Sequence, residues 1–332
     1  MGVVRRRILP AIAVATLGLS MVACSGQGGK KAEESQEAGG GNVAKTPRIK
    51  VAMVTHSEAG DTFWDIVQKG AKAAAQKDNA QFLYSNDPDG ARQAQLIDTA
   101  INQKVDGLIV TLAKPDAMKS AVEKAVDAGI PVVTINAGEK ESAAYGAIAH
   151  FGQEEGIAGE AAGTQLNTTG AKKALCVIHE QGHVGLEARC AGAKKTFDGE
   201  MVNLNVNGEN MPSVKSAITA RLQADKSIDS VLTLGAPIAL TAVSSVKDAG
   251  SDAKVSTFDL NKSLVDAIKK DEIQFAVDQQ PYLQGYLAVD QIWLQINNGN
   301  VIGGGQTVLT GPQIVTKDGV DKIGKFADKG TR

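Results

Sequence analysis

Aromatic residues are scarce in this chain: two Trp, four Tyr and seven Phe make up only 4% of its 332 residues. A marked excess of one charge is missing too, because 35 basic and 37 acidic side chains leave a net charge of −2. This balance argues against a nucleic-acid-binding protein, which would concentrate positive charge on one face. The remaining composition, 43% hydrophobic and 22% charged, is typical of a folded, soluble protein. The length allows two domains of roughly 150 residues each.

Long apolar runs are also absent, except for one at the N-terminus. Arg5-Arg6-Arg7 precedes an uncharged apolar stretch from Ile8 to Ala23, about 16 residues long, which Cys24 follows. A membrane-spanning helix needs about 20 residues, so the basic start and short apolar run predict an export signal over residues 1–23. The cysteine after Val22-Ala23 resembles a bacterial lipobox, which implies cleavage before Cys24 and lipidation of its thiol. The alternative is an ordinary signal peptide with a cysteine there by chance.

Residues 24–47 are expected to form a lipidated, disordered tether. From residue 25 to 47 the chain has six Gly, six charged residues and no aromatic residue. Such a stretch cannot bury enough apolar surface to fold. The export signal, the lipidated Cys24 and the tether together predict an exported domain that an N-terminal lipid holds at the outer face of the cell membrane.

From residue 48 onward, short apolar runs alternate with amphipathic segments. Continuous apolar strands between such helices indicate parallel sheets that are covered on both faces. The alternation occurs in two successive sets, which predicts an α/β fold with two doubly wound lobes. The expected strands are 49–54, 81–84, 107–111, 131–135, 174–178, 230–234 and 255–258, and the expected helices are 63–77, 91–103, 117–128, 186–197, 214–223 and 238–249.

Ligands of such folds bind at the carboxyl ends of the strands, so the residues there are candidate binding residues. Asp61, Phe63 and Trp64 follow the first strand and place two of the few aromatic rings beside a carboxylate. Rings stack on apolar C–H faces and a carboxylate accepts hydroxyl protons, a pairing that suits a sugar-like ligand. The alternative is that both rings only pack inward at the start of a helix.

Further polar side chains stand at or near other strand ends. Asn136 and Asp259 each end a predicted strand, Gln279 follows a strand-like run, and Arg189 lies early in a predicted helix. A single residue of this kind is more often a turn or a helix cap. Together with Asp61, however, they indicate a polar binding site.

Several motifs in order along the chain resemble a known family, the sugar-type periplasmic substrate-binding proteins of ABC transporters. This ribose-binding-protein-like group has the type I periplasmic binding protein fold. The similarity covers about residues 48 to 325 and rests on Asp61-Thr62-Phe63-Trp64, Gly129-Ile130-Pro131-Val132-Val133-Thr134-Ile135-Asn136, Gly156-Ile157-Ala158-Gly159, Arg189-Cys190-Ala191-Gly192, Phe258-Asp259 and Gln279-Gln280-Pro281.

The resemblance implies two lobes that a three-segment hinge joins and that close on one ligand. The expected lobes are 48–149 plus 280–308 and 150–279 plus 309–327. A monomer without catalysis, cofactor or metal is implied, whose partners are a sugar or polyol ligand and an ABC transporter permease.

The resemblance also implies roles for individual residues. Asp61 would bind a hydroxyl group, and Phe63 and Trp64 would sandwich the sugar ring. Arg189 would donate to ring or hydroxyl oxygens. The other implied ligand residues are Asn136, His150, Asp259 and Gln279. Three departures from the family pattern, Asn136-Ala137, Gly235-Ala236 and His150, argue against ribose itself and leave a smaller polyol, another pentose or a hexose.

One motif suggests a different class of protein. His179-Glu180-Gln181-Gly182-His183 matches the His-Glu-x-x-His pattern of zinc hydrolases, which needs both histidines on one helical face. Here the motif directly follows a predicted strand and contains Gly182, so a loop that faces the cleft is the favoured interpretation. In that loop His183 could touch the ligand, whereas His179 would cap or pack.

Cys176 and Cys190 are the remaining thiols once Cys24 is lipidated. In an exported protein they form either a disulfide or two buried free thiols, and the sequence leaves both open. The acidic pair Glu154-Glu155 and the charged run 269–272 are expected to be solvated.

The sequence thus predicts an extracytoplasmic lipoprotein that captures a sugar or sugar alcohol and delivers it to an ABC permease. One alternative is a sensor that presents a sugar or an autoinducer-like furanose to a receptor. The alternative from another class is a zinc-dependent hydrolase that uses His179 and His183.

Overall fold

The computed structural model describes residues 43–58 and 61–332. The predicted signal, Cys24 and the rest of the predicted tether up to residue 42 lie outside the described residues. Among the helices of the described ranges, none combines the length and the apolar character needed to cross a membrane.

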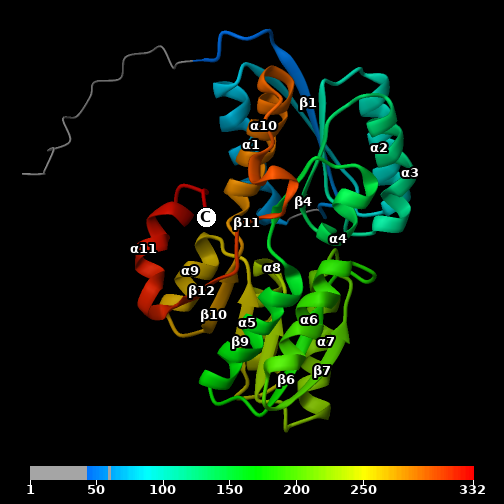
Figure 1. The fold of residues 1–332 in the computed structure, drawn as a ribbon. Coiled ribbons are helices and arrows are strands. Elements are labelled where there is room, and N and C mark those ends of the chain that lie inside the picture. Colours follow the sequence, from blue (N-terminus) through cyan, green and yellow to red (C-terminus); the bar gives the residue numbers. More distant parts are fainter. Residues whose placement is uncertain (1–42, 59–60) are drawn as a thin grey trace, which may run out of the picture. The chain divides into compact units, whose positions relative to one another are not determined.

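The chain forms two α/β lobes, each built on a six-stranded sheet (Figure 1). The sheet of the first lobe has the strand order β11-β5-β4-β3-β1-β2, and all of its neighbours pair in parallel. Its strands are β1 (Ile49–Thr55), β2 (Ala80–Asn86), β3 (Gly107–Val110), β4 (Val132–Asn136), β5 (Ala149–Gly152) and β11 (Val308–Leu309).

The sheet of the second lobe has the order β12-β10-β9-β8-β6-β7. It is parallel except for β12, which pairs antiparallel with β10 at the edge. Its strands are β6 (Lys173–Ile178), β7 (Glu200–Asn205), β8 (Ser230–Thr233), β9 (Lys254–Phe258), β10 (Ile273–Asp278) and β12 (Gln313–Thr316).

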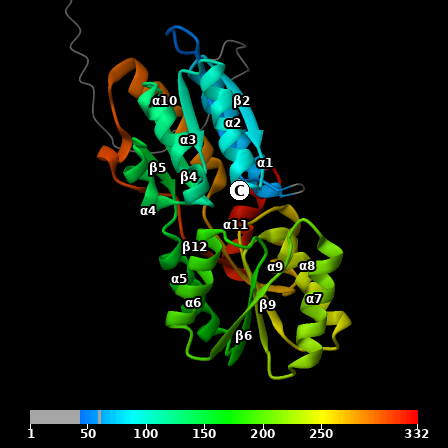
Figure 2. The same ribbon diagram turned by 90° about the vertical axis from the view of Figure 1, so that its right-hand side faces the viewer.

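Helices cover both faces of each sheet, as Figures 1 and 2 show. The first lobe contains α1 (Thr62–Lys77), α2 (Gly90–Asn102), α3 (Pro115–Asp127), α4 (Glu139–Ser142), α10 (Pro281–Asn298) and the 3-10 turns Ala143–Tyr145 and Ile302–Gly305. The second contains α5 (Glu155–Thr168), α6 (Val184–Thr196), α7 (Met211–Ala224), α8 (Ala236–Asp248), α9 (Lys262–Lys269) and α11 (Lys317–Ala327). The predicted doubly wound α/β architecture is thereby confirmed.

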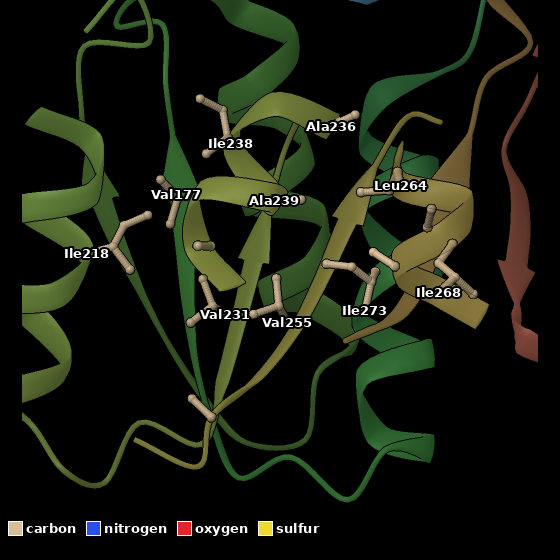
Figure 3. Packing of buried hydrophobic residues seen from close by; sticks show 14 of the residues in the cluster. Val177, Ile218, Val231, Ala236, Ile238, Ala239, Val255, Leu264, Ile268 and Ile273 are labelled. Atoms are coloured by element: carbon tan, nitrogen blue, oxygen red, sulfur yellow. The ribbon is translucent and has the colours of Figure 1, made fainter. Parts of the chain in front are cut away.

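Successive side chains of a strand point to opposite faces of the sheet, so each buried strand contributes residues to two separate hydrophobic cores. In the second lobe, Val177, Val231 and Val255 point from β6, β8 and β9 toward α7, α8 and α9 (Figure 3). Their neighbours along each strand, such as Cys176 and Leu232, pack on the opposite face against α5 and α6. Burying each of these valine side chains contributes about 1.5–3 kcal/mol to the stability of the fold. The cores thereby hold in place the strand ends at which the site forms.

Three segments cross between the lobes: one follows β5, one follows β10 and one follows β11. The lobe boundary expected after residue 149 therefore needs correction, because it would cut β5. This strand pairs over its whole length with β4 and belongs to the first sheet. The first crossover accordingly begins after Gly152.

Candidate functional site

A cavity of about 60 Å³ lies between the lobes, at the carboxyl ends of the strands. A cavity of this volume suits one small molecule rather than an oligomer. Residues of both lobes line it: His56, Glu58, Asp61, Thr62, Phe63, Trp64 and Asn136 from the first, and His179, Glu180, His183, Leu186, Arg189, Gly208, Met211, Leu234, Gly235, Ala236, Pro237, Ile238, Asp259, Leu260 and the hinge residue Gln279 from the second.

The start of α1 contributes a carboxylate and two rings to the cavity. Asp61 caps the helix, because its Oδ1 accepts a hydrogen bond of 3.0 Å from the backbone N–H of Phe63. The rings of Phe63 and Trp64 are buried, with centroids 5.0 Å apart and planes at 80°. The ring sandwich that the resemblance implies is therefore wrong in geometry, since neighbouring perpendicular rings cannot cover opposite faces of one ligand.

A hydrogen-bonded chain of side chains joins the two lobes at the hinge side of the cavity. Asn136 Nδ2 donates to Gln279 Oε1 over 3.0 Å, and Gln279 Nε2 donates to Asp259 Oδ1 over 2.7 Å. Asn136 and Asp259 both have left-handed backbone, with φ of 65° and 66°. Asn and Asp tolerate this conformation better than other residues with a side chain, and it turns the chain sharply at the strand end. Both polar strand ends therefore line the cavity.

The guanidinium of Arg189 is held by a carboxylate that the sequence did not indicate. Glu155 accepts from Arg189 Nε over 2.6 Å and from Arg189 Nη2 over 2.8 Å, and both side chains are buried. Burial alone would lower the pKa of Arg189, but Glu155 and Asp259 raise it above the ordinary value. The expectation that Glu154-Glu155 is a solvated pair is thus wrong for Glu155, which orients the arginine.

Close packing of α5 on α6 places this ion pair. A Cβ atom on Gly159 would lie 2.3 Å from the carbonyl oxygen of Arg189, and one on Gly192 would lie 2.2 Å from that of Gly156. Only glycine allows this approach of the two backbones. Of the two possibilities for the cysteines, the structure has the disulfide: Cys176 of β6 is bonded to Cys190 of α6, with a Cα–Cα distance of 6.0 Å.

His150, which the resemblance implies as a ligand residue, does not line the cavity. Its ring is 2% exposed within the first lobe, where Nδ1 lies 2.8 Å from Thr134 Oγ1. The strand β5 turns this side chain into the lobe interior, where burial lowers its pKa to about 4. The other eight predicted ligand residues line the cavity, although their contacts with a ligand stay a prediction.

A pair of histidines closes one side of the cavity. His56 follows β1 in the first lobe, and His183 precedes α6 in the second; their Nε2 atoms are 3.0 Å apart. His183 Nδ1 accepts from the backbone N–H groups of Gly185 and Leu186, so its proton lies on Nε2 and donates to His56. His56 is not among the residues predicted from the sequence. It directly follows a buried strand, which is the same signal that identified Asn136 as a candidate binding residue.

Comparison with known proteins identifies the family. The family model described as "Periplasmic binding protein domain" matches residues 51–300. The chain belongs to this family. It is a binding protein rather than an enzyme.

Among relatives of this periplasmic binding protein, the ribose import binding protein of Bacillus subtilis is 25% identical over 240 residues, which are 70% of this chain and 77% of the relative. A D-apiose import binding protein of Paraburkholderia graminis is 28% identical over 257 residues, 73% of this chain and 79% of the relative. A solved structure of a carbohydrate transporter from Acidothermus cellulolyticus in complex with myo-inositol is 52% identical, with a TM-score of 0.85; the match covers 86% of this chain and 100% of that one.

The zinc-hydrolase alternative conflicts with the geometry of this periplasmic binding protein. The His-Glu-x-x-His residues lie between β6 and α6 rather than on a helix, as the favoured interpretation expects. Donors of His56, Glu180 and His183 do lie within 4.8 Å of one another. A metal on His183 Nε2, however, would need the proton on Nδ1, where two backbone N–H groups already donate. Glu180 instead pairs with Lys114.

The lobes of this binding protein touch across the mouth of the cleft. Lys114 Nζ of the first lobe lies 3.2 Å from Glu180 Oε1 of the second. The backbone N–H of Val184 donates to the carbonyl oxygen of Ala113 over 3.1 Å. Together with the histidine pair, these contacts join the two lobes on one side of the cavity.

The charges that line the cavity disfavour an anionic ligand. Burial raises the pKa of Asp259 to about 7 against the effect of Arg189, and burial raises that of Asp61 to about 6 against its helix-cap hydrogen bond. Arg189 is already paired with Glu155. Among the lining residues that the structure describes, Arg189 is the one Lys or Arg, so a ligand carboxylate or phosphate would meet acidic groups without an unpaired cation beside them. Neutral hydroxyl groups, in contrast, can both donate and accept hydrogen bonds here.

Proposed function

We propose that this protein is an extracytoplasmic solute-binding lipoprotein that captures a neutral sugar or sugar alcohol and delivers it to an ABC permease. Among such ligands, myo-inositol is the first candidate. The support is the myo-inositol complex of a carbohydrate transporter that is 52% identical over 86% of this chain.

The observation that carries the proposal is the composition of the cavity wall. The cavity wall combines carboxylate, amide and guanidinium groups, which come from Asp61, Asn136, Arg189, Asp259 and Gln279. Such a set can satisfy the hydroxyl groups around a small ring, while the face of Trp64 or Phe63 covers its C–H groups. The departures at Asn136-Ala137 and Gly235-Ala236 that argue against ribose agree with a ligand of different hydroxyl pattern, since Asn136, Gly235 and Ala236 line the cavity.

Binding would work through closure of the lobes. The side chains that would contact the ligand come from both lobes, so the ligand stabilises the closed arrangement through differential contacts. The contacts between Lys114 and Glu180 and between His56 and His183 form only in that arrangement, which a permease could then recognise as loaded.

A ligand screen tests the proposed substrate class. We expect myo-inositol to raise the unfolding temperature of the purified protein, since a ligand at about 100 times its Kd stabilises the native state by about 2.7 kcal/mol. D-Glucose and D-glucuronate form a matched neutral and anionic pair, in which the anion should give no shift. Absence of a shift with myo-inositol, pentoses, hexoses and linear polyols alike would contradict the proposal.

The lipid anchor has its own test. Cells that express the full chain should carry the protein in the membrane fraction, with a lipid-modified Cys24 detectable by mass spectrometry. The Cys24→Ala variant should lose this attachment. Membrane association that this substitution does not change would contradict the lipoprotein assignment and leave the ligand assignment untouched.

A further inference from the structure

The second and third crossovers lie against each other at the hinge. Gln280, between β10 and α10, has left-handed backbone with φ of 57°. Its side-chain Nε2 donates to the carbonyl oxygen of Thr310 in the crossover after β11, over 2.6 Å. Any change in the angle between the lobes must therefore move these two segments together.

Arg332, the last residue of the sequence, binds both segments. Its Nη1 donates to Gln280 Oε1 over 3.0 Å, and its Nη2 donates to Gln313 Oε1 over 2.7 Å. The guanidinium also forms an ion pair with Asp278, the last residue of β10, whose side chain is fully buried. Asp278 and Gln313 are partners in the ladder between β10 and β12. One side chain thus holds three groups of the hinge.

The segment that carries Arg332 contacts both lobes. It follows α11, which packs on α9 in the second lobe. In the first lobe, Lys69 Nζ of α1 donates to the carbonyl oxygen of Lys329. Figures 1 and 2 place the C-terminal end of the chain at the junction of the lobes. The tail thus adds a noncovalent connection beside the three covalent crossovers.

The ion pair is directly linked to the ligand cavity. Asp278 precedes Gln279, whose amide joins Asn136 of one lobe to Asp259 of the other. The backbone N–H of Gln280 donates to Asp278 Oδ1 over 3.1 Å, so the carboxylate also shapes the turn after β10. Burial raises the pKa of Asp278, and Arg332 opposes this effect. Without Arg332, a charged carboxylate would be buried beside the turn that positions Gln279.

We propose that Arg332 is a positioning residue for ligand binding, which fixes the crossover at Asp278–Gln280 and thereby sets both the orientation of Gln279 and the angle between the lobes. This inference rests on the proposed function for the identity of its ligand.

The test compares Arg332→Gln with Lys329→Gln, which removes the same charge from an exposed position of the same tail. Titration calorimetry with myo-inositol should show about tenfold or greater weakening for Arg332→Gln, as for loss of one charge-assisted hydrogen bond, and less than a twofold change for Lys329→Gln. The double variant Asp278→Asn/Arg332→Gln removes the uncompensated charge and should recover most of the affinity. It also provides the comparison if Arg332→Gln alone does not fold.

A merely structural role would lower the unfolding temperature of Arg332→Gln without changing the Kd, and this result would overturn the proposal. A loss of affinity that the double variant does not reduce would overturn it as well. Should the wild type not bind myo-inositol, the proposed ligand fails while the hinge assignment stays testable. Small-angle X-ray scattering of the ligand-free proteins should then show that Arg332→Gln changes the radius of gyration, relative to the wild type, more than Lys329→Gln does. Identical scattering curves for the two variants would refute the hinge assignment.

Discussion

Replacing Glu155 by Gln removes one negative charge from beside Arg189, which lines the cavity, and changes the size of the side chain very little. In the wild type both carboxylate oxygens accept from Arg189, and a third hydrogen bond of 2.9 Å comes from Gln153 Nε2. Glutamine keeps a single acceptor oxygen, so one bond of the fork is lost and the buried guanidinium loses its nearest countercharge. Breaking a buried ion pair by removing one partner costs about 3–5 kcal/mol. The retained acceptor should reduce this loss to about 2–3 kcal/mol of unfolding free energy.

The effect on ligand affinity follows from the freed arginine. Asp259 Oδ2 lies 3.9 Å from Arg189 Nη1 and would attract the released guanidinium toward its own carboxylate. An arginine that turns to Asp259 no longer offers its donors to the ligand. A hydrogen bond from a charged donor contributes about 1.5–3 kcal/mol, which corresponds to roughly 10- to 100-fold weaker binding. Titration calorimetry with myo-inositol, together with urea unfolding of the ligand-free protein, measures both quantities.

The neighbouring residue supplies the control. Glu154 is also a glutamate, but its carboxylate only caps α5, with hydrogen bonds from the backbone N–H groups of Gly156 and Ile157. Glu154→Gln should cost at most about 1 kcal/mol of stability and leave the Kd unchanged. Wild-type affinity in Glu155→Gln, or equal losses in both variants, would refute the idea that Glu155 orients Arg189.

Three further substitutions test other parts of the structure. Trp64→Ala should lower the unfolding free energy by about 3–5 kcal/mol and weaken ligand binding, as urea unfolding and calorimetry would measure. Cys190→Ala opens a loop with a separation of 14 residues and should destabilise the protein by about 3 kcal/mol, an effect that a reductant should reproduce in the wild type. Burial lowers the pKa of His56 to about 3 in the folded protein. The unfolded chain therefore binds one more proton between about pH 3 and 6.5, so wild-type stability should rise with pH there by up to about 1.4 kcal/mol per unit more steeply than in His56→Gln. Parallel slopes in the two proteins would contradict this assignment.

The sequence by itself determined the architecture. Strands that are buried on both faces read as continuous apolar runs, and helices with one buried face show a period of 3.6, so both signals are local. The expectation that ligands bind at the carboxyl ends of the strands also uses only local sequence. It predicted Asn136, Asp259 and Gln279 as binding residues, and all three line the cavity. The same pattern applies to His56, which directly follows the first strand.

Tertiary structure alone decided how these residues meet. Glu155 was expected to be solvated, because nothing near it in the sequence shows that α5 and α6 approach closely enough to bring Arg189, 34 residues later, onto its carboxylate. His150 was expected at the ligand, but the register of β5 against β4 turns it into the lobe. Arg332 reaches Asp278 because the segment after α11 lies against the hinge. Such contacts depend on the relative placement of distant segments, which hydrophobic periodicity does not encode.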